Sequence, residues 1–217
     1  MLPRVKICCI ASTAEAEIAI NAGAAALGLV SAMPSGPGVI ADELIAEIAA
    51  VVPPPIASFL LTCRQEAEAI ITQHRQCRTN TLQLVDHVAP NELRKLRRQL
   101  PGINLVQVIH ITGPESIEEA QAVAPLVDAL LLDSGNQKLA IKELGGTGRT
   151  HDWRLSRKIR DSVSIPVFLA GGLTPDNVTD AIATVQPFGV DVCSGLRTAE
   201  TLDVNKVERF FRSANKK

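Results

Sequence analysis

Residues 166–195 read PVFLAGGLTPDNVTDAIATVQPFGVDVCSG, and this stretch decides the fold. Two short apolar runs, at 166–170 and 190–193, flank a segment at 175–184 that has the character of a helix. Continuous apolar runs, rather than alternating ones, are typical of parallel strands that are buried on both faces. A strand, a helix and a second strand in this order predict a parallel βαβ unit.

The same alternation extends over the whole chain. Eight strand-like runs with short helical connections favour a closed barrel over an open, doubly wound sheet, which usually has fewer strands. We therefore predict an α/β fold, a single (β/α)8 TIM barrel, with residues 1–217 as one domain. The predicted strands are 5–9, 26–30, 56–60, 81–85, 105–109, 129–132, 166–170 and 190–193, and the predicted helices are 13–21, 42–50, 64–73, 91–99, 115–124, 153–161, 175–184 and 204–214.

The composition excludes several classes of function. A net charge of −1 provides no basic surface for nucleic acid, and no apolar run of about 18 residues is present that could cross a membrane. The five cysteines are odd in number and show no CxxC spacing, and the four histidines show no ligand spacing. We therefore expect no disulfide framework, no metal site and a location in the reducing cytoplasm.

In a barrel of this kind the active site lies where the strands end and the βα loops begin. Cys8 and Cys9 end the first predicted strand, and alternation along the strand allows only one of them to face the barrel mouth. A free cysteine is more often a small buried apolar residue than a catalytic group. Asp133 ends the sixth predicted strand, where it is either a cap for the next loop or a catalytic group.

Glycines follow the last two predicted strands, at Gly171-Gly172 and at Ser194-Gly195. Glycines can simply turn the chain, but the loops after strands 7 and 8 are the recurrent phosphate site of this fold, and successive N–H groups can hold an anion. Asp191 lies within the eighth strand, so its charge must be paired or bind a ligand hydroxyl. Gly146 belongs to a glycine-rich segment in the long connection 136–152.

These residues carry a specific family resemblance that spans essentially the whole chain. Residues 5–8 resemble the VKICG opening of phosphoribosylanthranilate isomerases, and residues 24–30 are similar to the family's GADAIGFVF. Residues 131–134, 145–148 and 152–153 resemble its LLDS, GGTG and DW motifs. Residues 169–178 (LAGGLTPDNV) and 189–195 (GVDVCSG) match closely.

The resemblance implies a reaction in tryptophan biosynthesis, the Amadori rearrangement of N-(5-phosphoribosyl)anthranilate, without metal or cofactor. It implies Cys8 as the general base and Asp133 as the general acid. It also implies that the two glycine loops hold the substrate phosphate and that Asp191 lies near the ribose hydroxyls. The expected partner is a phosphorylated small molecule, and the chain is expected to be a monomer or a homodimer.

The first half of the chain departs from the family pattern. Pro37 falls where the family carries an arginine that pairs with the anthranilate carboxylate, and no basic residue occurs between Lys6 and Arg64. The family's QLHG reads Gln83-Leu84-Val85-Asp86, and the glycine after Cys8 is Cys9. We therefore expect weak recognition of the carboxylate, seen first as a raised KM, unless Arg149 or Arg197 replaces the missing cation. Two alternatives stay open: an isomerase or lyase of another phosphorylated sugar, and a barrel that binds a phosphorylated metabolite without turnover.

Overall fold

The computed structural model describes residues 3–135, 139, 141–146 and 148–216. Its main sheet is one closed parallel barrel in which each strand pairs with the next and β8 pairs with β1. The barrel predicted from the sequence is therefore confirmed. Its strands are β1 (Arg4–Ile7), β2 (Ala26–Val30), β3 (Ala57–Thr62), β4 (Thr81–Leu84), β5 (Asn104–His110), β6 (Ala129–Asp133), β7 (Val167–Leu169) and β8 (Gly189–Val192).

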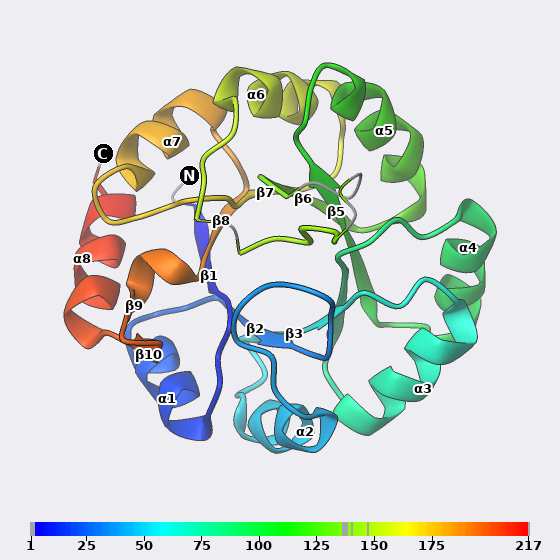
Figure 1. Ribbon diagram of the computed structural model, residues 1–217, viewed down its shortest axis with the longest axis horizontal. Coiled ribbons are helices and arrows are strands. Elements are labelled where there is room, and N and C mark those ends of the chain that lie inside the picture. The colour runs from blue at the N-terminus through cyan, green and yellow to red at the C-terminus, as the bar shows by residue number, and fades with distance from the viewer. Residues whose placement is uncertain (1–2, 136–138, 140, 147, 217) are drawn as a thin grey trace.

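The helices form a ring around the barrel, as Figure 1 shows in a view down its axis. They are α1 (Thr13–Asn21), α2 (Asp42–Val51), α3 (Ala67–Cys77), α4 (Pro90–Gln99), α5 (Glu115–Val123), α6 (Trp153–Ser162), α7 (Val178–Val185) and α8 (Val204–Ala214), with the short helices η1 (Ala124–Leu126) and η2 (Ser194–Leu196). After β8 the chain also forms a small antiparallel pair, β9 (Arg197–Thr198) and β10 (Thr201–Leu202), which the sequence did not predict.

Several predicted boundaries were wrong by a few residues, each for a local reason. Helix α3 begins at Ala67 rather than at 64, because the Arg64 N–H bonds to Thr62 Oγ1 at 3.2 Å and holds the chain in a turn. Helix α7 begins at Val178 rather than at 175, because Asn177 Oδ1 accepts from the Thr174 N–H at 2.8 Å in another turn. By contrast, α1 has the predicted bounds and begins after Ser12, whose side chain accepts from the Glu15 N–H.

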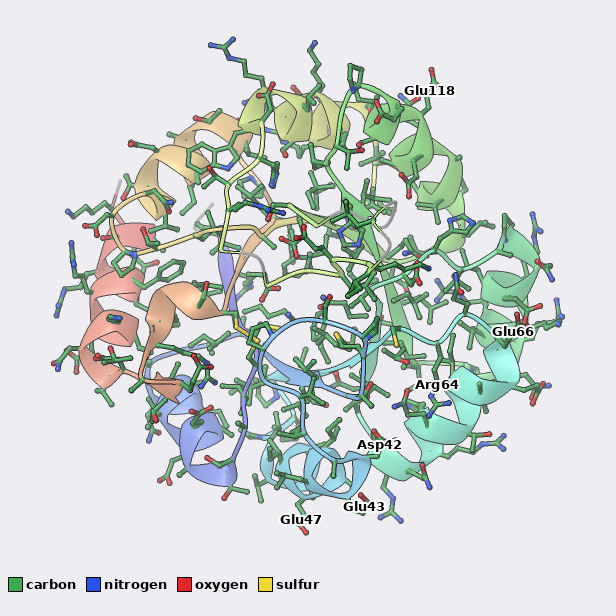
Figure 2. All side chains as sticks on the ribbon, viewed as in Figure 1. Asp42, Glu43, Glu47, Arg64, Glu66 and Glu118 are labelled. Atoms are coloured by element: carbon green, nitrogen blue, oxygen red, sulfur yellow. A yellow bond between two sulfur atoms is a disulfide. The ribbon has the colours of Figure 1, made fainter. Side chains whose placement is uncertain are left out.

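The apolar residues form two layers of packing on either side of the barrel wall. One cluster lies between the strands and the helices, and the other fills the barrel interior, where Phe59 and Phe168 meet edge to face at 6.1 Å between ring centres. Charged side chains such as Glu47 and Glu118 project outward from α2 and α5 (Figure 2). No helix within the described ranges is long and apolar enough to cross a membrane.

Cys9 and Cys193 form a disulfide that joins the loop after β1 to the loop after β8, with their Cα atoms 5.9 Å apart. The expectation of no disulfide was therefore wrong. The expectation that only one of Cys8 and Cys9 faces the barrel mouth was also wrong, since both line the cavity there. The strand β1 ends at Ile7 and Cys9 has a left-handed φ of 63°, so strand alternation does not reach Cys9. The bond encloses a sequence separation of 184 residues and ties the first strand to the last.

This cross-link generates a stability prediction. A loop of this length should make the disulfide worth about 2–5 kcal/mol of unfolding free energy, so Cys193→Ser should lose that amount. Cys9→Gly should lose about 1 kcal/mol less, because glycine adopts the left-handed φ without strain. Urea unfolding followed by Trp153 fluorescence, with and without dithiothreitol, measures both. If reductant leaves the wild-type transition unchanged, the pair does not stabilise the barrel.

Candidate active site

A cavity of about 60 Å³ lies at the carboxyl ends of the strands, where the sequence placed the site. It is lined by residues that follow β1, β2, β6, β7 and β8. All but one of the predicted site residues line it, namely Cys8, Asp133, Gly146, Gly171, Gly172, Asp191 and Ser194. The exception is Gly195, which packs against the backbone of Leu173, where a side chain would meet the carbonyl group.

An ion pair within the barrel lies next to Cys8. Lys6 Nζ donates to Asp191 Oδ1 at 2.9 Å, and both side chains are buried. Burial alone would lower the pKa of Lys6, but Asp191 and Cys8 outweigh it and raise that pKa, so Lys6 stays charged. A side chain at Gly28 would lie 2.7 Å from Cys8 Sγ and 2.9 Å from Lys6 Nζ, so the glycine leaves the space in which these two groups meet.

Burial dominates the acidity of the Cys8 thiol. Burial raises the pKa of Cys8 to about 11, while the nearby Lys6 ammonium acts in the opposite direction. The largest influence on the pKa of the thiol is its burial, as for other ionisable groups removed from water. Lys6 is the group placed to stabilise a Cys8 thiolate when one forms.

Asp133 reaches the same cavity from the end of β6. Its Oδ1 accepts from the Ser134 N–H at 2.7 Å. Its Oδ2 lies 2.5 Å from the point where a Cβ of Gly145 would stand, so the glycine makes room for the carboxyl group. Burial raises the pKa of Asp191, and the nearby charge of Asp133 raises it further, so the two carboxyl groups lie close enough to influence each other.

The glycine loops provide N–H groups for an anion. Within the described part of the chain, no acceptor is bonded to the N–H groups of Gly171, Gly172, Ser194 or Gly195. Ser194 and Gly195 open the short helix η2, where N–H groups have no partner inside the helix. These groups can donate to a phosphate, as glycine-rich loops of this kind commonly do. Thr147 of the GGTG motif lies outside the described residues.

The loop 31–41 after β2 crosses the barrel mouth, as the blue segment at the centre of Figure 1 shows. Ser35 Oγ donates to the Lys142 carbonyl at 2.6 Å, and Pro37 lies against Gly146, so this loop contacts the one after β6. A side chain at Gly38 would lie 2.5 Å from the Cβ of Cys9. Ligand cavities usually exceed about 300 Å³, so this cavity is small with the loop in this position.

Three cations near the mouth each form an ion pair. Arg197 pairs with Glu15 at 2.7 Å and donates to the Cys9 carbonyl, and its side chain is only 9% exposed, so it is not the replacement cation that the sequence allowed. Arg149 pairs with Glu143 and is largely exposed. Lys142 pairs at 2.5 Å with Asp86, which lies two residues after the end of β4, and the Lys142 side chain is 39% exposed.

Three polar side chains near the mouth were missed from the sequence. Gln83 lines the cavity, and its Oε1 is buried without a hydrogen-bond partner. His110 ends β5, where its Nε2 lies 2.9 Å from the Val85 carbonyl. His151 lies beside Gly171. For the first two, the position at or near a strand's carboxyl end was a usable signal, whereas His151 follows a long loop and gave none.

The described residues contain no group of three or more histidine, cysteine, aspartate or glutamate side chains that could hold a metal ion. The candidate base Cys8 and the candidate acid Asp133 lie in one cavity with the open N–H groups of the glycine loops, and Lys6 is buried next to Cys8. This arrangement can bind an anion at one side of the cavity and transfer protons at the other.

Solved structures with the same architecture match this chain over nearly its whole length. A phosphoribosylanthranilate isomerase from Thermotoga maritima is 29% identical with a TM-score of 0.84, and the match covers 98% of each chain. Another isomerase of this type, in complex with reduced 1-(o-carboxyphenylamino)-1-deoxyribulose 5-phosphate, is 27% identical with a TM-score of 0.81 and the same coverage.

Relatives found by sequence belong to the same family of isomerases. The N-(5'-phosphoribosyl)anthranilate isomerase of Haloarcula marismortui is 37% identical over 217 residues, which is 98% of this chain and 96% of that protein. The isomerase of Methanocella arvoryzae is 35% identical over 211 residues, with 97% of each chain covered. Residues 5–213 match the profile described as N-(5'phosphoribosyl)anthranilate (PRA) isomerase. The chain belongs to the N-(5'-phosphoribosyl)anthranilate isomerase family.

Proposed function

We propose that this chain isomerises N-(5'-phosphoribosyl)anthranilate to 1-(o-carboxyphenylamino)-1-deoxyribulose 5-phosphate, a step of tryptophan biosynthesis. The observation that carries the proposal is the joint placement of Cys8 and Asp133 in one cavity with the open N–H groups of Gly171, Gly172 and Ser194. Family membership over residues 5–213 supports it. The experiment that tests it is conversion of this substrate by the purified protein.

The proposed reaction uses two proton transfers. Asp133 gives a proton to the furanose ring oxygen, the bond from C1 to that oxygen breaks, and the nitrogen lone pair forms the imine. The Cys8 thiolate then takes the C2 proton, and the electron pair of that bond forms the C1–C2 double bond of the enolamine. The enolamine tautomerises to the ketone. The N–H groups after β7 and β8 hold the phosphate, and Asp191, fixed by Lys6, lies near the ribose hydroxyls.

We infer a cytoplasmic location, a phosphorylated small molecule as the binding partner, and a monomer or homodimer. The free thiols of Cys8, Cys63 and Cys77 support a reducing compartment, whereas the Cys9–Cys193 bond favours an oxidising one. A solved relative from Thermotoga maritima is described as dimeric, with variants that are monomers.

The acid and base assignments give a first prediction. Cys8→Ser and Asp133→Asn should each lower kcat by a factor on the order of 100 or more, the usual size of a general acid–base contribution. Cys63→Ser and Asp128→Asn are the matched controls. The Cys63 thiol donates to the Ala32 carbonyl. Asp128 lies at the opposite end of the barrel, where it pairs with Arg97. Wild-type rates in both active-site variants would favour the barrel that binds a phosphorylated metabolite without turnover.

The buried thiol gives a second prediction, on pH. The base acts only when deprotonated, and burial raises the pKa of Cys8 to about 11, so the fraction of thiolate falls about tenfold for each pH unit below that value. We expect the thiolate absorbance near 240 nm, taken as the difference between the wild type and Cys8→Ser, to rise with a midpoint near pH 11. A midpoint at or below pH 8 would contradict a buried, protonated resting thiol.

The carboxylate of the anthranilate substrate needs a cation to bind it. We infer that Lys142 is this cation. It is partly exposed, it approaches the mouth between β4 and the loop 31–41, and Leu144, two residues further on, lines the cavity. No lysine or arginine lies in the loop 31–41 itself. The charge therefore comes from the side of the mouth opposite the phosphate loops.

Replacement of this cation should change KM rather than kcat. Lys142→Met should raise KM for the anthranilate substrate by about tenfold or more, because a hydrogen bond to a charged group is worth about 1.5–3 kcal/mol. Lys158→Met, on the exposed side of α6, is the matched control and should change neither constant. If Arg149→Ala raises KM and Lys142→Met does not, the loop after β6 provides the anchor through Arg149 instead.

A further inference from the structure

His151 precedes α6 and is held at one ring nitrogen only. Its Nε2 lies 2.7 Å from Ser156 Oγ, and Ser156 is fully buried in the first turns of α6. Its Nδ1 is buried and has no hydrogen-bond partner. A buried ring nitrogen without a partner is costly and calls for a functional explanation. Neither the family motifs of this region nor the proton transfers described above use this side chain.

The unpaired nitrogen lies near the general acid, although no hydrogen bond joins the two. The point where a Cβ of Gly171 would stand lies 3.0 Å from His151 Nδ1 and 3.2 Å from Asp133 Oδ1. Because glycine has no side chain, the two groups converge on the same space at the edge of the cavity. Asp133 is also a source of charge that acts on His151, together with the adjacent Asp152.

Electrostatics selects the tautomer of the ring. If the ring proton were on Nε2, the bare lone pair of Nδ1 would repel the carboxylate that Asp133 becomes once it has given its proton to the substrate. If Ser156 donates its hydroxyl proton to Nε2, the ring proton is on Nδ1 and points toward the carboxylate. Burial lowers the pKa of His151, while Asp133 and Asp152 act against this, so the imidazole is neutral at pH 7 and keeps a single N–H to donate.

We propose that His151 is a positioning residue for the general acid, donating its Nδ1–H to Asp133 Oδ1 as the carboxylate forms. This inference rests on the proposed function. When Asp133 gives its proton to the ring oxygen, it becomes negative close to Asp191, which opposes the new charge. A donor that faces the carboxylate at that moment stabilises it, as donors aimed at developing charge do in other enzymes. The Ser134 N–H holds the same oxygen, so together they fix the orientation of the carboxyl group.

The kinetic test compares two replacements of the same ring. His151→Phe removes the donor and should lower kcat by at least about tenfold with little change in KM. His151→Asn keeps an N–H donor near the position of Nδ1 and should recover a substantial part of the rate. His87→Phe is the matched control, since His87 is exposed and takes part in hydrogen bonds only through its backbone. Equal loss in both His151 variants, or wild-type rates in both, would overturn the proposal.

A second measurement does not depend on activity. An NMR titration of the His151 ring, assigned from the signal that is missing in His151→Phe, should give a lower pKa in Asp133→Asn than in the wild type, because a facing carboxylate raises it. If the wild-type protein does not isomerise the anthranilate substrate but this shift is present, the proposed function fails while the pairing of His151 with Asp133 stands. An unchanged titration in Asp133→Asn would refute the pairing itself.

Discussion

The ion pair between Lys6 and Asp191 is the interaction around which the barrel mouth is arranged. The two residues are register partners on β1 and β8, the strands that close the barrel, and both side chains point inside it. Lys6 also lies 5.2 Å from the centre of the Phe59 ring. Removing one partner of a buried pair leaves an uncompensated charge and typically costs about 3–5 kcal/mol. The pair therefore ties closure of the fold to the electrostatics of the proposed site, because the same lysine stands beside the Cys8 thiol.

Around this pair, the site consists largely of positions that have no side chain. Gly28 leaves space for Cys8 and Lys6, Gly145 leaves space for the Asp133 carboxyl group, and Gly171 leaves space for Asp133 and His151. In each case an added Cβ would lie 3.2 Å or less from the functional atom. Real Cβ atoms rarely approach other atoms so closely. Close approach of reactive groups, more than backbone flexibility, explains why glycine occupies these positions.

The sequence predicted those parts of the molecule that depend on local pattern. The bounds of α1 and α8 and of β2 follow from capping residues and apolar periodicity. The position of most candidate residues around one cavity follows from the rule that active sites of this fold lie at the carboxyl ends of the strands. The parts that it missed depend on contacts between distant loops. The Cys9–Cys193 bond requires a left-handed residue directly after a strand, which breaks the alternation that the prediction used. The pairing of Arg197 with Glu15 joins residues 182 positions apart, and no local pattern signals it.

The loop after β2 packs directly against the disulfide. Gly38 has a φ of 75°, and a side chain there would lie 2.5 Å from the Cβ of Cys9 and 3.2 Å from its sulfur. With this backbone, the loop has no space at that position for a long cation directed at the mouth. The loop is instead fixed by Ser35 to the Lys142 carbonyl, which holds the Lys142 side chain near Asp86 at the end of β4. The packing of this loop against Cys9 and its hydrogen bond to the Lys142 carbonyl thus leave Lys142 as a cation beside the mouth, which the loop itself does not provide.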